Sequence, residues 1–223
     1  MMNCYDDNEN LLLEYCSKNN IDLSSTQQYM LKEYVLFLQK WNKHYNLTAI
    51  SDIKGIITYH LIDSISTLPF LDAFLKFEDV DICDVGSGAG LPGVIISIMR
   101  PKWNVVCVDS IGKKTVFMNQ VGHMLDLSNL SVIKSRIELL NNLSFDLIIS
   151  RAFSSLKNFT KNTKHLLKAN GIFCAMKGKM PKDEIFDLLS TKEFFIDKVE
   201  ILNNVDLVTN RCLVFVRNAK MNL

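Results

Sequence analysis

Residues 79–99, DVDICDVGSGAGLPGVIISIM, combine a carboxylate with closely spaced glycines in a way that suits a nucleotide-like ligand. One motif in this stretch, G-x-G-x-x-G, is typical of dinucleotide-binding turns and is formed by Gly88, Gly90 and Gly93. A second motif, D-x-G-x-G-x-G, starts at Asp84 and is associated with loops that bind S-adenosylmethionine. Both motifs use the same few residues, so the turn alone leaves both cofactors open.

Two residues of the turn favour the second cofactor. Pro92 has no N–H group and removes one donor from any phosphate cradle. Asp84 ends a strand-like run, where its carboxylate is unfavourable beside a pyrophosphate but suits a cationic or amino-bearing ligand. S-adenosylmethionine carries a sulfonium and an α-ammonium group and no phosphate. We therefore expect it to bind at Asp84, Gly86, Gly88 and Gly90.

A second carboxylate and a later turn complete the expected cofactor site. Asp109 ends the next apolar run, 19 residues after Gly90, where it can accept hydrogen bonds from the ribose of either cofactor. The alternative is a helix cap before the segment IGKKTVF, a role that aspartate also suits. Ile137 and Glu138 follow the third apolar run and are expected near the adenine.

The elements that must position these residues begin after residue 79, where short apolar runs alternate with helical patterns. The predicted strands are 80–85, 104–110, 130–135, 145–150, 171–178, 197–202 and 211–217. Apolar strands separated by helices are typical of a parallel sheet covered on both faces. The last two strands have only a short connection, so they are expected to pair as an antiparallel hairpin. This ending disfavours a dehydrogenase, which would also need a substantial catalytic domain.

The first part of the chain has a helical pattern from residue 7 to about residue 68. Ser24 and Gln27 have the spacing of a capping box, and apolar residues then recur at helical intervals. A further helix over 52–68 is expected to end before Pro69. We therefore expect an N-terminal helical extension, residues 1–78, followed by an S-adenosylmethionine-dependent domain, residues 79–223.

Basic residues are unevenly distributed along a chain whose net charge is only +1. Residues 151–182 contain eight Lys or Arg residues and no acid, which either attracts an anionic partner to one face or forms a solvated helix surface. Four basic side chains follow predicted strands and are expected to meet at one edge of the sheet, where they suit phosphate or a base edge. They are Arg136, Arg151, Lys177 and Lys179.

Composition excludes several other classes. Hydrophobic residues make up 48% of the chain and charged residues 22%, as in ordinary globular domains, and no apolar run reaches the ~18 residues of a membrane span. The six cysteines form no C-x-x-C pair or metal-binding spacing, so they are expected to be core residues, and we expect neither zinc nor a disulfide. The acidic N-terminus lacks the basic region of a signal peptide, which predicts a cytoplasmic protein.

The segments from about residue 30 to 185 closely resemble the bacterial small-subunit ribosomal RNA guanine-N7 methyltransferases, also called glucose-inhibited division protein B. The matching segments are WNKHYNLTAI, HLIDSI, DVGSGAGLPG, DSIGKK, SRIE, SRAFSSL and MKGKMPKDE. Several of them, among them YNLTAI, GAGLPG and SRAF, are specific to this family. Ser51 departs from the pattern, since many relatives have arginine there.

The resemblance implies a seven-stranded, Rossmann-like class I methyltransferase sheet behind a helical extension. It implies methyl transfer from S-adenosylmethionine to N7 of a guanine in 16S rRNA, free or within the 30S subunit, by an enzyme that we expect to be a monomer. The cofactor positions that it carries over are Gly86, Leu91, Ile137, Glu138 and Arg151, with Asp109 as the ribose acceptor. On the residues alone, a small-molecule methyltransferase, an NAD-dependent oxidoreductase and a non-catalytic RNA-binding protein remain alternatives.

The implied reaction explains why no catalytic dyad stands out in the sequence. Guanine N7 has an in-plane lone pair and attacks a methyl group without prior deprotonation, so no general base is expected and Arg151 is expected to position the substrate. His60 and Asp63 lie on one face of the predicted second helix. They either line the target pocket or attach the helical extension to the sheet.

Overall fold

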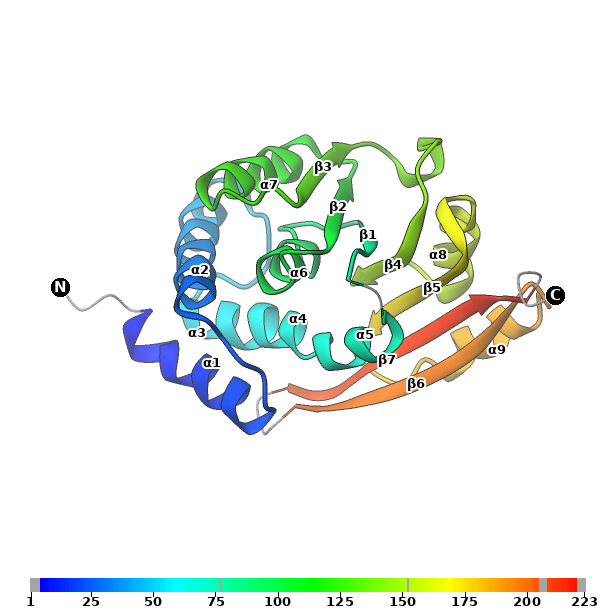
Figure 1. The fold of residues 1–223 in the computed structure, drawn as a ribbon, viewed down its shortest axis with the longest axis horizontal. Coiled ribbons are helices and arrows are strands. Elements are labelled where there is room, and N and C mark those ends of the chain that lie inside the picture. The colour runs from blue at the N-terminus through cyan, green and yellow to red at the C-terminus, as the bar shows by residue number, and fades with distance from the viewer. Residues whose placement is uncertain (1–4, 77, 152, 205–207, 220–223) are drawn as a thin grey trace.

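A computed structural model of the chain describes residues 5–76, 78–151, 153–204 and 208–219 (Figure 1). Its centre is a seven-stranded sheet with the order β3-β2-β1-β4-β5-β7-β6. The strands are β1 (Asp81–Val85), β2 (Asn104–Asp109), β3 (Leu130–Lys134), β4 (Phe145–Arg151), β5 (Leu167–Lys177), β6 (Phe194–Asn204) and β7 (Val208–Asn218). The first five strands are parallel, and β7 lies antiparallel between β5 and β6. The predicted seven-stranded sheet with a terminal antiparallel hairpin is confirmed.

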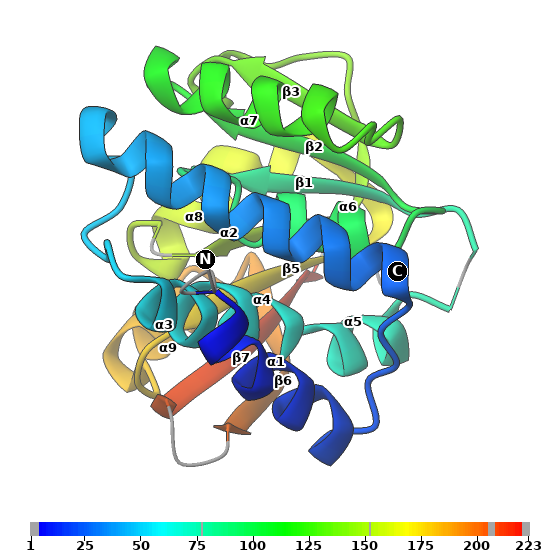
Figure 2. The same cartoon turned by 90° about the vertical axis from the view of Figure 1, so that its left-hand side faces the viewer.

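Helices cover both faces of the sheet. They are α1 (Asp6–Lys18), α2 (Ser25–Tyr45), α3 (Ile53–Ile56), α4 (Asp63–Ile65), α5 (Leu68–Phe74), α6 (Gly93–Met99), α7 (Gly112–Met124), α8 (Leu156–Thr163) and α9 (Lys182–Leu189). One face is covered by α6, α7 and the helices that precede β1, and the other by α8 and α9 (Figure 1). Helix α2 runs across the first face beside α6 and α7 (Figure 2).

The strands are apolar on both sides because both sides are buried. In β4, Leu147 and Ile149 belong to the cluster under the N-terminal helices, whereas Ile148 between them belongs to the cluster under α8 and α9. This alternation follows from the two-residue period of a strand. The five cysteines that the structure describes are buried and free, as expected of core residues, and Cys4 lies outside the described residues.

The helices before residue 79 share a hydrophobic core with the sheet. The capping box at the start of α2 is confirmed, with Ser24 and Gln27 bonding each other's backbone N–H groups. The ring of Phe74 in α5 stacks on Phe215 of β7 with centroids 4.1 Å apart. One cluster of buried side chains runs from α1 to the sheet. The boundary between residues 78 and 79 as a division of domains stays a prediction.

The helix predicted over residues 52–68 differs from expectation. It consists of α3, a π-helical segment at residues Ile57–Ile62 and α4, and Pro69 lies in the first turn of α5 instead of ending a helix. A proline is tolerated there because the first N–H groups of a helix have no intrahelical acceptor. Single π-turns inside helices frequently accompany functional sites, so residues 57–62 are candidates for such a site.

The ring pair between α5 and β7 predicts how strongly the extension and the sheet depend on each other. Phe215 is fully buried, so Phe215→Ala is expected to lower the free energy of unfolding by about 3–5 kcal/mol. Urea denaturation measures the change. Phe186→Ala is the matched control, because Phe186 is 74% exposed and its loss is expected to change stability by less than ~0.5 kcal/mol. Equal effects of the two substitutions would contradict the shared core.

Candidate active site

The buried carboxylate of Asp84 hydrogen-bonds across the glycine-rich loop that follows β1. Asp84 Oδ2 accepts a hydrogen bond of 2.9 Å from the Gly93 N–H, and the Ser87 hydroxyl donates to the Asp84 carbonyl at 2.8 Å. A Cβ atom on residue 93 would lie 2.8 Å from Asp84 Oδ2 and would collide with Cys107 Sγ. Glycine is therefore required at position 93, where α6 begins against the sheet.

Asp84 lies beneath the loop and not in the wall of the pocket described below. Its side chain is fully buried, and among the described residues Oδ1 has no hydrogen-bond partner. Burial raises the pKa of Asp84 to about 7, although the bond from Gly93 opposes this shift. Asp84 thus contacts the loop through the Gly93 N–H, and its contact with a cationic ligand stays a prediction.

Helix α2 of the extension supports the same loop from the other side. The buried Tyr34 hydroxyl donates a 2.8 Å hydrogen bond to the Ala89 carbonyl. Gly90 has φ +82, and a Cβ on it would collide with Val94. Leu91 is buried in the core with its side chain 2% exposed, so it supports the loop from below.

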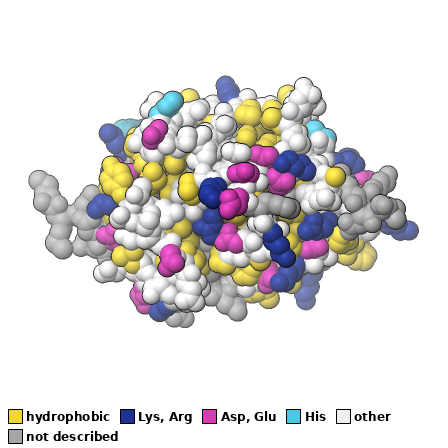
Figure 3. Space-filling model, viewed as in Figure 1, with side chains coloured by type: hydrophobic (Ala, Val, Ile, Leu, Met, Phe, Trp, Pro, Cys, Tyr) yellow, Lys and Arg dark blue, Asp and Glu magenta, His cyan; other side chains and the backbone are white. Residues whose placement is uncertain are grey.

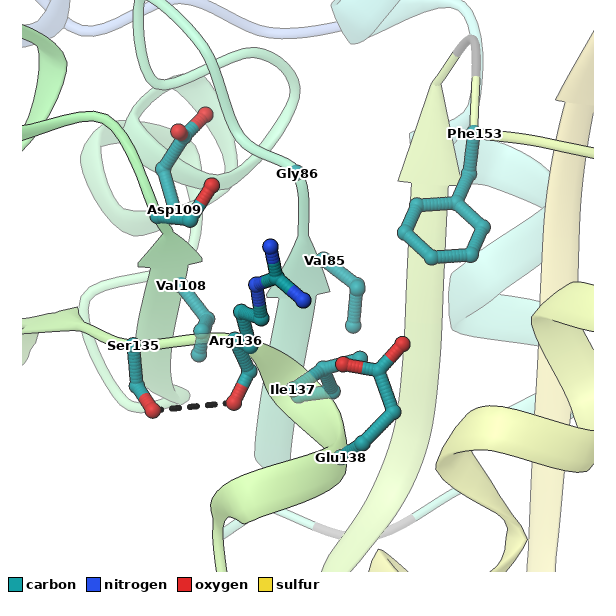
Figure 4. Close-up of a pocket in the computed structure, with 10 residues that line it drawn as sticks. Val85, Gly86, Val108, Asp109, Ser135, Arg136, Ile137, Glu138 and Phe153 are labelled. Atoms are coloured by element: carbon teal, nitrogen blue, oxygen red, sulfur yellow. Dashed lines mark hydrogen bonds between the residues drawn. The ribbon is translucent and has the colours of Figure 1, made fainter.

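A pocket of about 230 Å³ lies at the carboxyl ends of β1 and β2 and beside the segments that follow β3 and β4 (Figure 4). Parallel sheets bind ligands at this edge. Asp109 and Phe153 stand on opposite sides of the opening, and the Arg136 side chain extends between them. The lining residues are Val85, Gly86, Val108, Asp109, Ser110, Ser135, Arg136, Ile137, Glu138 and Phe153.

The Asp109 carboxylate is held in place by backbone donors. Oδ2 accepts from the Gly88 N–H at 3.0 Å and Oδ1 from the Ile111 N–H at 2.9 Å, with Lys114 Nζ 3.7 Å from Oδ2. A carboxylate has about four lone-pair sites, so these bonds orient Asp109 and still leave acceptors for two ribose hydroxyls. The alternative role is present in part: Asp109 accepts the N–H of Ile111 just before α7, although Ile111 and not Asp109 occupies the N-cap position.

Two further predicted residues, Ile137 and Glu138, lie in the same pocket. Ile137 is 4% exposed and offers an apolar wall, while Glu138 is exposed and accepts a 2.9 Å bond from Asn162. Phe153 was not predicted, although it belongs to the same SRAFSS segment as Arg151. An aromatic residue just after a strand end was the signal for it. Together, a fixed ribose acceptor, apolar walls and the glycine loop fit an adenosyl group.

A second pocket, of about 620 Å³, contains Arg151 at the carboxyl end of β4, the strand that pairs with β1. Arg151 Nη1 donates to the Tyr59 carbonyl at 3.1 Å, lies 3.2 Å from His60 Nδ1 and is 3.4 Å from Asp63 Oδ2. Arg151 lines this pocket and Phe153 lines the first, so the two pockets adjoin along the chain. The lining residues are Ala49, Ile50, Ser51, Asp52, Gly55, Tyr59, His60, Arg151 and Arg211.

His60 and Asp63 serve both roles that the sequence left open. His60 lines the pocket, and Asp63 forms ion pairs with Arg151 of β4 and Arg211 of β7, so it also attaches the extension to the sheet. Burial, followed by the charge of Arg151, lowers the pKa of His60 to about 4, so the imidazole is neutral at pH 7. Sequence reasoning missed Arg211, because it lies in the terminal hairpin far from every motif.

The remaining basic residues predicted at the sheet edge differ in their surroundings. Arg136 lines the first pocket. Lys177 donates hydrogen bonds to Glu184 at 2.8 Å and to the Ser154 carbonyl at 3.1 Å, so its ammonium group is paired within the protein. Lys179 is exposed. Positive and negative side chains are interspersed on the face in Figure 3. Arg136, Arg151 and Lys177 follow parallel strands whose carboxyl ends share one edge of the sheet, and a role of the basic residues in binding RNA stays a prediction.

Within the described part of the chain, no helix is both long and apolar enough to cross a membrane. Across the same residues, no three His, Cys, Asp or Glu side chains gather in a way that could hold a metal ion.

Comparison with solved structures defines the class. An S-adenosylmethionine-dependent methyltransferase from Clostridium acetobutylicum superposes with a TM-score of 0.57 at 16% identity, covering 82% of this chain and 98% of that one. A SAM-dependent methyltransferase from Aquifex aeolicus gives a TM-score of 0.52 at 21% identity, covering 67% and 87%. The fold is that of the class I S-adenosylmethionine-dependent methyltransferases.

The family follows from sequence comparison. The family model for rRNA small subunit methyltransferase G (GidB) matches residues 27–214. Proteins named ribosomal RNA small subunit methyltransferase G are similar throughout: that of Bordetella pertussis is 39% identical over 95% of this chain and 94% of its own. That of a Polaromonas species is 41% identical over 88% of each chain. The chain belongs to the rRNA small subunit methyltransferase G family. This confirms the predicted family and the predicted class of enzyme, an S-adenosylmethionine-dependent methyltransferase.

The contact between residue 93 and the sheet predicts the effect of adding one methyl group there. Gly93→Ala is expected to lower stability by about 1–3 kcal/mol, because the new Cβ overlaps Asp84 and Cys107. It should also weaken binding of S-adenosylhomocysteine, measured by calorimetry, because the loop shifts. Gly122→Ala in α7 is the control: its Cβ would make an ordinary contact at 3.5 Å with Leu130 of β3, and stability should stay equal or rise by up to ~1 kcal/mol. Similar losses in both variants would contradict the tight fit of residue 93.

The buried Asp84 predicts a pH dependence of stability. A carboxyl whose folded-state pKa is raised to about 7 stabilises the fold most when protonated, so this contribution is present below pH ~4 and is lost as the pH rises to about 7. Asp84→Asn keeps an acceptor for the Gly93 N–H and removes the titration. Urea denaturation from pH 5 to pH 8 should show the variant gaining stability relative to the wild type as pH rises. A constant difference would contradict the raised pKa.

Proposed function

We propose that the protein transfers the methyl group of S-adenosylmethionine to N7 of a specific guanine in 16S rRNA of the small ribosomal subunit. The observation that carries the proposal is a pair of pockets at the ends of the neighbouring strands β1 and β4 in a chain of this family: one suits an adenosyl group, and the other contains Arg151. An rRNA substrate implies that the enzyme works in the cytoplasm. We also propose that it acts as a monomer.

The cofactor site provides binding and orientation. S-adenosylmethionine, when bound, supplies an electrophilic methyl group. Asp109 accepts the ribose hydroxyls, Ile137 and Val108 provide apolar walls, and Gly86 allows the backbone to come close to the ligand. Asp84, beneath the loop, keeps the Gly93 N–H engaged so that the loop holds one shape.

The substrate site needs no general base. Guanine N7 attacks through its own lone pair, and the titratable His60 is engaged at both ring nitrogens, with Thr48 Oγ1 2.8 Å from Nε2 and Arg151 Nη1 3.2 Å from Nδ1. The rate then comes mostly from holding N7 in line with the methyl group. Orientation of this kind can contribute up to ~7–11 kcal/mol.

Arg151 is the residue that would orient the substrate. Its Nη1 is held by the Tyr59 carbonyl, His60 and Asp63, so the guanidinium cannot rotate freely. Its position just before Phe153 places it where the two pockets adjoin. A guanidinium in this place donates hydrogen bonds to guanine O6 or to phosphate while N7 remains free.

The experiment is transfer of labelled methyl from S-adenosylmethionine to undermethylated 30S subunits and, in a parallel arm, to free 16S rRNA. Strand cleavage specific for N7-methylated guanine then locates the product. Label at one guanine N7 is expected. Arg151→Ala should reduce kcat/KM at least ~10-fold, because misplacement of the reacting groups by about 1 Å can cost up to ~100-fold.

Two controls separate the possible outcomes. The affinity for S-adenosylhomocysteine shows whether the cofactor site of each variant is intact. Label absent from both RNA substrates while S-adenosylhomocysteine still binds would contradict rRNA methylation and favour a small-molecule substrate. Undiminished methylation by Arg151→Ala would remove Arg151 from the proposal without affecting the reaction.

A further inference from the structure

The second pocket carries hydrogen-bonding groups that the methyl-transfer chemistry above does not use. Besides Arg151, it is lined by Arg211 from β7, by Asp52 from the start of α3 and by Tyr59 from the π-helical segment. Its volume of about 620 Å³ is within the usual range of ligand pockets. We call it the Arg211 pocket.

Arg211 is held at one nitrogen and free at the others. Its Nε lies 3.2 Å from Asp63 Oδ1, and Asp63 Oδ2 lies 3.4 Å from Arg151 Nη1, so one buried carboxylate positions two arginines. The side chain of Asp63 is 2% exposed and that of Arg211 is 31% exposed. Among the described residues, Nε has this ion pair but no hydrogen bond, and neither terminal nitrogen of Arg211 donates a hydrogen bond to a protein acceptor. Its paired N–H donors are therefore available to a ligand.

Asp52 provides the complementary acceptor. Its Oδ1 accepts a 2.7 Å bond from the Gly55 N–H and caps α3, which fixes the orientation of the carboxylate. Within the described part of the chain, Oδ2 accepts no hydrogen bond, and the residue is exposed at the pocket. Tyr59, 42% exposed, adds an aromatic ring to the same wall.

The charges around the pocket balance. Arg151 and Arg211 carry two positive charges, and Asp52 and Asp63 carry two negative charges. His60 is neutral at pH 7. A free anion would gain little from such a site. A neutral ligand that offers an acceptor beside donors, and a flat face for stacking, matches it much better.

Guanine has this arrangement on its Watson–Crick edge, with the acceptor O6 beside the donors N1–H and N2–H₂. We propose that the Arg211 pocket selects the target base as guanine: Arg211 donates to O6, Asp52 accepts from N1–H and N2–H₂, and Tyr59 stacks on the ring. Adenine presents a donor where guanine has O6 and an acceptor at N1, so both contacts would be mismatched. The arrangement leaves N7 free to attack the methyl group. This part of the argument rests on the proposed function.

The test uses the full chain saturated with S-adenosylhomocysteine and measures nucleoside binding by saturation-transfer NMR, which detects millimolar affinities. Guanosine should bind most tightly, inosine, which lacks the 2-amino group, less tightly, and adenosine at least ~10-fold more weakly than guanosine. Asp52→Asn keeps the cap, because asparagine caps a helix as well as aspartate, but it replaces the acceptor. It should weaken guanosine at least ~10-fold and abolish the preference over inosine.

Arg211→Gln should likewise reduce guanosine affinity at least ~10-fold, with S-adenosylhomocysteine affinity unchanged. The controls are Arg217→Gln and Asp197→Asn, an ion pair at 3.1 Å on the same hairpin outside the pocket, and both should behave as the wild type. Absence of guanosine binding to the wild type, equal binding of adenosine, or wild-type selectivity in Asp52→Asn would each overturn the proposal.

The failure of this proposal can be distinguished from failure of the proposed function. If 16S rRNA is methylated at guanine N7 while Asp52→Asn and Arg211→Gln keep wild-type kcat/KM, the base is recognised elsewhere and only the pocket assignment falls. If guanosine binds with the expected selectivity while rRNA receives no label, the pocket stands and the rRNA substrate falls.

Discussion

The hydrogen bond from the Gly93 N–H to the buried Asp84 carboxylate is the interaction on which the cofactor site depends. It connects the end of β1 to the start of α6, so the chain between them must turn sharply within seven residues. That turn places the Gly88 N–H against Asp109 at 3.0 Å and the Ala89 carbonyl against Tyr34 at 2.8 Å. A carboxylate buried in this way is costly unless it has a donor, and the loop geometry supplies one.

A second buried carboxylate organises the substrate side. Asp63 belongs to the helical extension, and its partners Arg151 and Arg211 end β4 and occupy β7. Three segments that are distant in sequence thus meet at one acid. Because a buried acid is stable only when its charge is compensated, the extension, the parallel part of the sheet and the terminal hairpin are coupled energetically. The extension is therefore bound to the sheet through Asp63, and it supplies most of the residues that line the second pocket.

The two sides divide the chemistry. The first pocket is built by the sheet and its loops and has features common to the fold, namely a glycine turn and a carboxylate after the second strand. The second pocket is built mostly from the extension, and Arg151 of β4 and Arg211 of β7 complete its lining. Since the reaction at N7 requires no proton transfer, the protein can hold its one pocket histidine neutral and use it to orient Arg151. Related folds can keep the first part and change the second to accept other substrates.

The sequence by itself determined whatever depends on neighbouring residues. Runs of consecutive apolar residues predicted the strands, and the Ser24–Gln27 spacing predicted the cap of α2. The glycine motif and Asp109 predicted the edge of the sheet at which the first pocket lies. These features are local because helix and strand periods and turn conformations act over a few residues. Only the fold could show that Asp84 is buried beneath its loop, because burial depends on what packs against a residue from elsewhere in the chain.

Tertiary structure likewise decided which charged side chains pair with each other. The fold brings Glu184 to 2.8 Å from Lys177, and the hairpin brings Arg211, which belongs to no motif, to 3.2 Å from Asp63. Electrostatic interactions fall off over a few ångströms in space, whatever the separation in sequence. The chain's own pattern therefore identifies which residues can do chemistry, and packing decides which of them face a ligand.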